Sequence, residues 1–203
     1  TPGGTRRVTL HRAGGRGADA GAVDTVLARL FAAREERPRP ERDGTVLTSW
    51  NAIAARGLID AGRAFDEPAM IREGVALARL LLQRAVREDG VVREPGDPSV
   101  ARVRLLEDAA HLVAALLTTS DVTGDSGLLE AAEDLYYDTL QRFSEGHVLY
   151  STAEDTDLPV RPRDGADDPV PTGTSTTIEN AVRLGAATGD AWFYAYARGA
   201  LEQ

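Results

Sequence analysis

The chain has 203 residues, of which 42% are apolar and 27% charged, the balance of a globular protein with one domain or slightly more. Its longest apolar run, residues 191–197, is far shorter than the roughly 20 residues that cross a bilayer, which excludes a membrane-spanning segment. The net charge of −9 excludes a basic surface for nucleic acid or for an anionic membrane.

Missing residue types and motifs exclude several chemistries. All 23 basic residues are arginine, which excludes Schiff-base and P-loop lysines, and without cysteine there is no disulfide, thiolate zinc site or cysteine nucleophile. The sequence also lacks the glycine-rich loops that bind nucleotides, the His-Glu-x-x-His motif of zinc proteases and the Gly-x-Ser-x-Gly motif of α/β-hydrolases. The three histidines, His11, His111 and His147, are too few and too scattered for a metal site. We therefore expect no metal and no cofactor.

The start of the chain carries no targeting signal. Residues 1–17 are polar and glycine-rich, begin with Thr1 rather than Met, and lack the apolar core of a secretion signal. We therefore expect a cytoplasmic protein, and a chain cut from a longer one.

Apolar residues recur every three or four positions, which predicts an all-α chain. Residues 1–47 are interpreted as a lead-in segment, with a helix over 22–35 and then a proline-rich loop, since prolines disfavour helix. Three helical hairpins are expected over residues 48–87, 106–143 and 175–203. Their helices are predicted at 48–64 and 67–87, at 106–118 and 126–143, and at 175–188 and 191–201.

The joints between paired helices repeat. Each has a glycine that ends one helix and an aspartate that starts the next, and Asp66, Asp125 and Asp190 are the expected N-caps. A repeat of about 60 residues, in which no hairpin buries its own apolar face, is typical of stacked hairpins in a solenoid or closed toroid.

Long connections separate the hairpins, at residues 88–105 and 144–174. Each begins with a turn and a short β-like run, at 91–93 and 147–150, which predicts small β-hairpins at one rim. Loops of more than about 12 to 15 residues in a compact domain are usually functional or disordered, so this rim is where a site is expected.

Three segments resemble a known family. Residues 37–51 resemble the signature that opens a helix in YyaL-type and spermatogenesis-associated thioredoxin-domain proteins, and residues 7–11 sit where that family has a strand. Leu106-Glu107-Asp108-Ala109-Ala110 resembles the family's Leu-Glu-Asp-Tyr-Ala. Residues 161–164 and 171–175 resemble its Arg-Pro-Lys-Asp and Pro-Ser-Gly-Asn-Ser.

The resemblance implies half of an (α/α)6 toroid, similar to N-acylglucosamine 2-epimerases and six-hairpin glycosidases, with a thioredoxin-like domain N-terminal to it. Six hairpins of about 60 residues need roughly 360 residues, so a homodimer, a second chain or a longer protein is expected to complete the ring. The chain departs from the family pattern at Asp43-Gly44-Thr45, where the family has Asp-Asp-Lys, and at Thr174, where it has Asn. These losses favour a weakened or silent site.

The motifs fall where the first helix of each hairpin begins, so their side chains are expected to converge on one rim. Trp50 and Asn51 would suit a sugar, through ring stacking and amide hydrogen bonds. The alternative, which we favour, is that Trp50 anchors the core and Asn51 ties down a loop.

Glu107, Asp108 and His111 are the candidate catalytic residues. An acid beside an imidazole is the minimum set for general acid–base catalysis of sugar epimerisation or hydrolysis. The favoured alternative is structural, since acids in a first helical turn stabilise the helix dipole by about 0.3 to 1 kcal/mol.

The loop before the third hairpin supplies the other candidate contacts, Arg161, Asp164, Thr172 and Thr174. Asp164, Asp167 and Asp168 could bind a hard cation, but a solvated loop is favoured because no chelating motif supports a cation site. Arg161 and Arg163 could clamp an anion, although pairing with these aspartates is favoured.

Two functions remain open from the sequence. The first is a sugar-binding or sugar-processing toroid, epimerase-like or glycosidase-like. The second is a non-catalytic helical scaffold that docks a thioredoxin-like domain or another protein. The departures from the family pattern slightly favour the scaffold for this chain alone.

Overall fold

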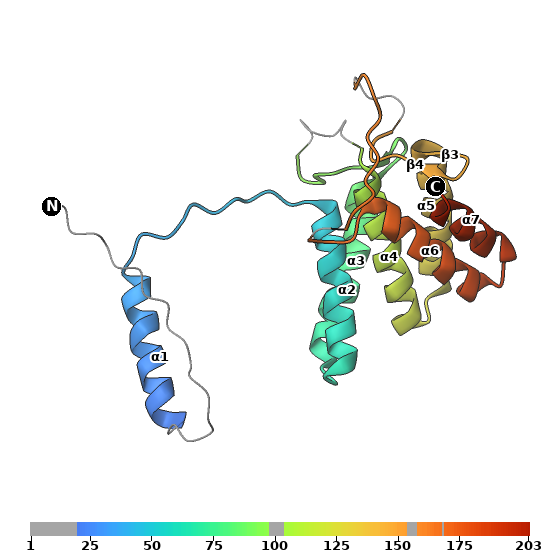
Figure 1. Cartoon of the computed structure of the whole chain (residues 1–203). Helices are drawn as coiled ribbons and strands as arrows, with labels where there is room; N and C mark the ends of the chain where they lie inside the picture. Colours follow the sequence, from blue (N-terminus) through green and yellow to red (C-terminus); the bar gives the residue numbers. More distant parts are fainter. Residues whose placement is uncertain (1–19, 98–103, 154–157, 168) are drawn as a thin grey trace. The chain divides into compact units, whose positions relative to one another are not determined.

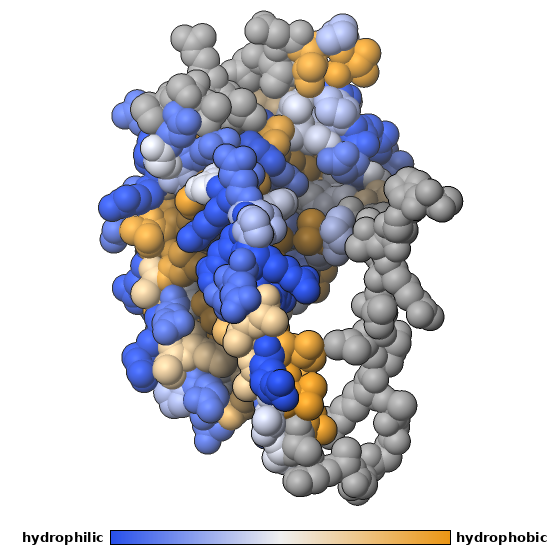
Figure 2. Space-filling view, turned by 90° about the vertical axis from the view of Figure 1, so that its left-hand side faces the viewer, coloured by the Kyte–Doolittle hydropathy of each residue, from blue (hydrophilic) through white to orange (hydrophobic). Residues whose placement is uncertain are grey.

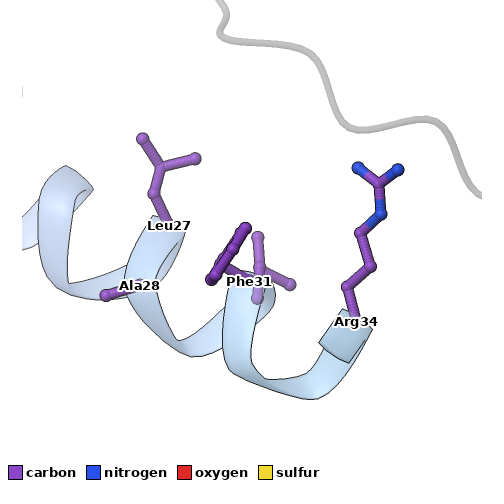
Figure 3. Close-up of a pocket in the computed structure, with 5 residues that line it drawn as sticks. Leu27, Ala28, Phe31 and Arg34 are labelled. Atoms are coloured by element: carbon purple, nitrogen blue, oxygen red, sulfur yellow. The ribbon is translucent and has the colours of Figure 1, made fainter. Parts of the chain in front are cut away.

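A computed structural model describes residues 20–97, 104–153, 158–167 and 169–203, and two compact units divide the chain, Thr1–Gly44 and Thr45–Gln203. The strand expected at residues 7–11 lies outside the described residues. In the first unit, helix α1 spans Ala20–Glu35 (Figure 1). Leu27, Leu30 and Phe31 are solvent-exposed, and together with Ala28 and Arg34 they line a shallow hollow, shown in Figure 3.

The second unit consists of three helical hairpins in two layers (Figure 1). Helices α2 (Thr48–Ala64), α4 (Leu106–Thr123) and α6 (Gly173–Thr188) form one layer, in which α4 packs between the other two. Helices α3 (Pro68–Ala85), α5 (Ser126–Phe143) and α7 (Ala191–Leu201) each pack on the helix that precedes them. The all-α fold class is confirmed, and the structure ends the fourth helix at Thr123 rather than 118.

Two small antiparallel β-hairpins follow α3 and α5, as the turn signals predict. Strand β1 (Val86–Arg87) pairs with β2 (Gly90–Val91), and β3 (Ser144–Glu145) pairs with β4 (Val148–Leu149). They lie at the end of the helices where α2 and α4 begin, at the top of Figure 1. This end is called the rim below.

The first two hairpins repeat each other closely. Helices α2 and α4 begin at residues 48 and 106, 58 positions apart, and the same spacing separates α3 from α5 and β1 from β3. The amide of Thr48 donates to Arg93 O at 2.8 Å, and the equivalent amide of Leu106 donates to Ser151 O at 3.0 Å. The repeat inferred from the joints is therefore present in the backbone hydrogen bonds as well.

The joints differ, however. Asp125 and Asp190 are N-caps as predicted, since their carboxylates accept from the amides two residues ahead. The prediction for Asp66 is wrong: this residue has a φ of 56°, and the N-cap position falls on Glu67. The nearby Gly62 lies inside α2, where a Cβ would come within 2.7 Å of Ile71 Cγ1, so this glycine allows close helix packing rather than ending a helix.

The core lies between the two layers. Helix α4 is buried along nearly its whole length because neighbours cover it on both sides, and Leu112 and Leu116 have no exposed surface. Edge-to-face, tilted and stacked rings meet between α5 and α7, formed by Tyr136, Tyr137, Trp192, Phe193 and Tyr196. Among the described helices, none has the length and apolar character needed to cross a bilayer.

Candidate functional site

The start of α4 caps the start of α2. Helix α2 has Leu47 at its N-cap, which offers no side-chain acceptor, and the amide of Ser49 instead donates to Asp108 Oδ1 at 2.9 Å. The Asp108 side chain is completely buried. A carboxylate from the neighbouring hairpin thus satisfies one of the backbone donors that a helix start leaves unpaired.

Arg93 joins this junction from the segment after the first β-hairpin. Its Nη1 donates to Glu107 Oε1 at 2.5 Å and lies 3.4 Å from Asp108 Oδ2. The side chains of Arg93 and Glu107 are 25% and 35% exposed. One carboxylate of the adjacent pair therefore faces the solvent at the rim, and the other serves the packing of two hairpins.

The buried carboxyl group is electrostatically unusual. Burial raises the pKa of Asp108 to about 6, although the hydrogen bonds from Ser49 and the charge of Arg93 act in the opposite direction. A perturbed pKa is common at functional sites, but buried structural ion pairs produce it too.

His111 holds the loop that leads into α6. Its Nε2 lies 3.0 Å from Pro171 O, and its Nδ1 is buried with no hydrogen-bond partner among the described residues. Burial lowers the pKa of His111, so the neutral ring is favoured. His111 and Glu107 share one face of α4, but Glu107 is partly exposed and the imidazole points into a packed interface.

The start of α6 packs against the start of α4 with little space. A Cβ on Gly173 would lie 2.7 Å from the Glu107 amide nitrogen, so only glycine fits there without a shift. Thr172 caps α6 by accepting from the Ser175 amide at 3.1 Å, and Asp167 accepts from the Thr172 amide at 2.8 Å. The N-termini of the three helices therefore meet at one rim, as expected.

The remaining candidate residues of the first and third motifs are Trp50, Asn51 and Thr174. Trp50 is 64% exposed, so the interpretation that it anchors the core is wrong. Asn51 donates through Nδ2 to Leu47 O at 2.7 Å, which fits its interpretation as a loop tie. Thr174 is half-buried in the first turn of α6.

Within the described part of the loop, neither Arg161 nor Arg163 pairs with Asp164 or Asp167, contrary to the favoured interpretation for these two aspartates. Arg161 donates to Glu145 at 3.1 Å and lies over the ring of Tyr150, 4.2 Å from its centre. Arg163 reaches Gln203 O at 3.4 Å, and Asp164 accepts from Ser151 Oγ at 2.7 Å. Asp167 accepts from the Thr172 amide, as described above, and Asp168 lies outside the described residues.

Two features of the site were not identified by the sequence analysis. Arg93 stands in a long loop with no motif around it, and only its place between two carboxylates gives it a role. Arg56 of α2 reaches Glu179 of α6 at 2.8 Å, so this ion pair spans the α4 helix that lies between them. The two charges are 123 positions apart in the sequence, so no local pattern indicates their pairing.

The chain is similar to known proteins in sequence, although no protein-family model matches it. It is 30% identical to rat spermatogenesis-associated protein 20 over 184 residues, which is 82% of this chain and 23% of that protein. It is 28% identical to the human protein over 211 residues, 91% of this chain and 26% of that protein. The chain thus spans about a quarter of the length of these relatives.

Solved structures show the fold. A GH76 α-mannanase from Bacteroides thetaiotaomicron superposes with a TM-score of 0.64 at 15% identity, over 90% of this chain and 54% of that one. The unsaturated glucuronyl hydrolase of Bacillus sp. GL1 has a TM-score of 0.60 at 18% identity, over 80% of this chain and 47% of that one. The chain is therefore homologous to part of spermatogenesis-associated protein 20, and it has the helical-hairpin fold of the α/α-toroid glycosidases.

Proposed function

We propose that the rim binds a carbohydrate through Glu107 and Arg93. The observation that carries the proposal is that these two charged side chains remain partly exposed at the point where the starts of α2 and α4 meet. A carboxylate that accepts and a guanidinium that donates can together bind neighbouring hydroxyls of a sugar ring.

The similar structures favour the same ligand class by analogy. An α-1,6-mannanase from Salegentibacter sp. HEL1_6, with a TM-score of 0.62 at 14% identity, is described as inactive when two adjacent aspartates are replaced, in complex with α-1,6-mannotetraose. This chain also carries two adjacent carboxylates, Glu107 and Asp108, in the first turn of a helix.

Binding is better supported than hydrolysis. Glycosidases use two carboxyl groups within about 10 Å of each other, both in reach of the sugar. Here Asp108 is fully buried and occupied by Ser49 and Arg93, so it positions α2 rather than contacting a ligand. Of the adjacent pair, only Glu107 reaches the solvent, and hydrolysis would need a second accessible carboxylate.

Titration with α-1,6-mannotetraose by NMR or calorimetry tests the proposal. The variant Glu107→Gln keeps the shape of the side chain, removes its charge and is expected to weaken binding about tenfold. Glu130→Gln, at an exposed position of α5, is the matched control and should bind like the unchanged protein. Equal binding by both variants, or no binding by the unchanged protein, would contradict the proposal.

A non-catalytic scaffold is the second candidate function. It is favoured by the use of Asp108 and His111 in packing, because neither side chain is free to meet a substrate. The scaffold predicts no response to the oligosaccharide in the same titration. A thioredoxin-like domain remains the partner that the sequence resemblance suggests for it.

A further inference from the structure

A hollow lies between the second halves of α4 and α6, away from the rim. It has a volume of about 250 Å³ and is lined by Leu117, Asp121, Arg183, Ala186 and Ala187. Asp121 follows Glu107 on α4 by 14 positions, which at about 1.5 Å per residue separates the hollow from the rim by about 21 Å. The hollow is therefore a separate place on two of the helices that form the rim.

An ion pair forms the polar part of the hollow. Arg183 Nη2 donates to Asp121 Oδ2 at 2.9 Å, and the two side chains are 21% and 57% exposed, so a ligand can reach both. The guanidinium is also held by α4, because it donates to Ala114 O at 3.2 Å and to Thr118 Oγ1 at 3.0 Å. Arg183 is thus oriented before any ligand arrives, and less binding free energy is lost in ordering it.

The lining as a whole favours an uncharged ligand that carries hydroxyl groups. The charges of Arg183 and Asp121 compensate each other, so the hollow has no net charge to attract a phosphate or a carboxylate. It offers a donor and an acceptor side by side, and a hydroxyl both donates and accepts. The remaining lining residues, Leu117, Ala186 and Ala187, are apolar and match the C–H face of a sugar ring. Apolar patches also interrupt the hydrophilic surface on the face shown in Figure 2, so the apolar lining alone would not identify a ligand.

We propose that this hollow binds one neutral sugar ring, as a second site separate from the rim. Its volume of about 250 Å³ is just below the roughly 300 Å³ at which ligand pockets usually begin, so it takes a single ring rather than a chain of rings. The apolar face of the ring lies on Ala186 and Ala187, and neighbouring hydroxyls bind Arg183 and Asp121. The site uses no residue of the rim, so it stands or falls independently of the function proposed above.

Titration of the full 203-residue chain with methyl α-mannopyranoside, a neutral sugar of one ring, tests the proposal by NMR. The amide signals of Leu117, Asp121 and Ala187 should shift and saturate, and inorganic phosphate at the same concentrations should leave them unchanged. No shift at these residues with the sugar, or a larger response to phosphate, would overturn the proposal. Shifts confined to Arg93 and Glu107 would support the rim site alone and would overturn the second site.

Two variants check the apolar and the charged part of the hollow separately. Ala187→Phe fills the hollow and should raise the dissociation constant of the sugar at least about tenfold. Ala187 is exposed, so the fold should tolerate the change, and circular dichroism checks it. Ala195→Phe, at an exposed position of α7, is the matched control and should bind like the unchanged chain.

Asp121→Asn leaves the charge of Arg183 uncompensated. It should weaken sugar binding and allow phosphate to shift the same amide signals, a change of ligand class that a purely structural role of the ion pair would not produce. Sugar binding that is unchanged in both Ala187→Phe and Asp121→Asn would overturn the proposal.

Discussion

The two junctions between neighbouring hairpins use opposite electrostatics. Between α2 and α4 the central group is a buried acid, Asp108, surrounded by donors. Between α4 and α6 it is a buried imidazole, His111, beside a backbone carbonyl, and a glycine packed on backbone atoms. The repeated backbone is therefore held by different chemistry at equivalent places, and pH and mutation should affect the two junctions differently.

The largest effect is expected from Gly173→Ala at the α4–α6 junction. The new Cβ would lie 2.7 Å from the amide nitrogen and 3.0 Å from the Cα of Glu107, so backbone rather than a flexible side chain must move. We expect a loss of about 3 kcal/mol in the free energy of unfolding, measured by urea denaturation. Gly165→Ala is the control, because a Cβ there meets nothing within 4 Å. Equal stability of both variants would contradict this tight contact.

The two junctions should also give opposite pH dependences. The pKa of Asp108 is about 6 in the folded state against an ordinary value of 3.8, so the folded state holds the proton more tightly and stability falls as pH rises through this window. The expected loss from this group is about 2 kcal/mol between about pH 4 and pH 7. The lowered pKa of His111 acts in the other direction, because the unfolded state binds the proton more tightly below the ordinary histidine pKa.

Single variants separate these two slopes. Stability of Asp108→Asn should rise with pH across the acidic range, since of these two buried groups only His111 still titrates. Stability of His111→Gln should fall over the same range. Denaturation curves at several pH values check both, and identical profiles for the two variants would contradict the assignment.

Asp108→Ala should have a smaller effect at neutral pH. It leaves the Ser49 amide without its acceptor at the start of α2, and we expect a loss of about 1.5 kcal/mol. Asp108→Asn keeps an acceptor oxygen and is expected to lose less. Hydrogen exchange at the Ser49 amide should increase in the alanine variant, and unchanged exchange would argue against capping by Asp108.

The smallest effect is expected from Arg93→Gln. The Arg93–Glu107 pair is partly exposed, so water already screens much of the attraction, and a loss of about 0.5 kcal/mol is expected. The same variant should weaken oligosaccharide binding if the rim is the carbohydrate site. Lost binding with nearly unchanged stability would separate the ligand role from the structural one.

Sequence reasoning succeeded where a local rule decides the outcome. Helical periodicity predicted the helices, and the Asp125 and Asp190 caps follow from residue type and position alone. The same rule failed for Asp66, because Gly62 serves the close approach of α3 rather than the end of α2. A local pattern cannot tell these two uses of a glycine apart.

The amino-acid sequence by itself determined the helical hairpins, their repeat and the rim on which the motifs meet, because periodicity, caps and turns act over a few residues. Only the tertiary structure decided that Asp108 is buried and Glu107 partly exposed, although they are neighbours on one helix. It also brought Arg93 to both carboxylates and Arg56 to Glu179. Burial and charge pairing depend on which helices pack together, and such contacts join residues with no local relation in the chain.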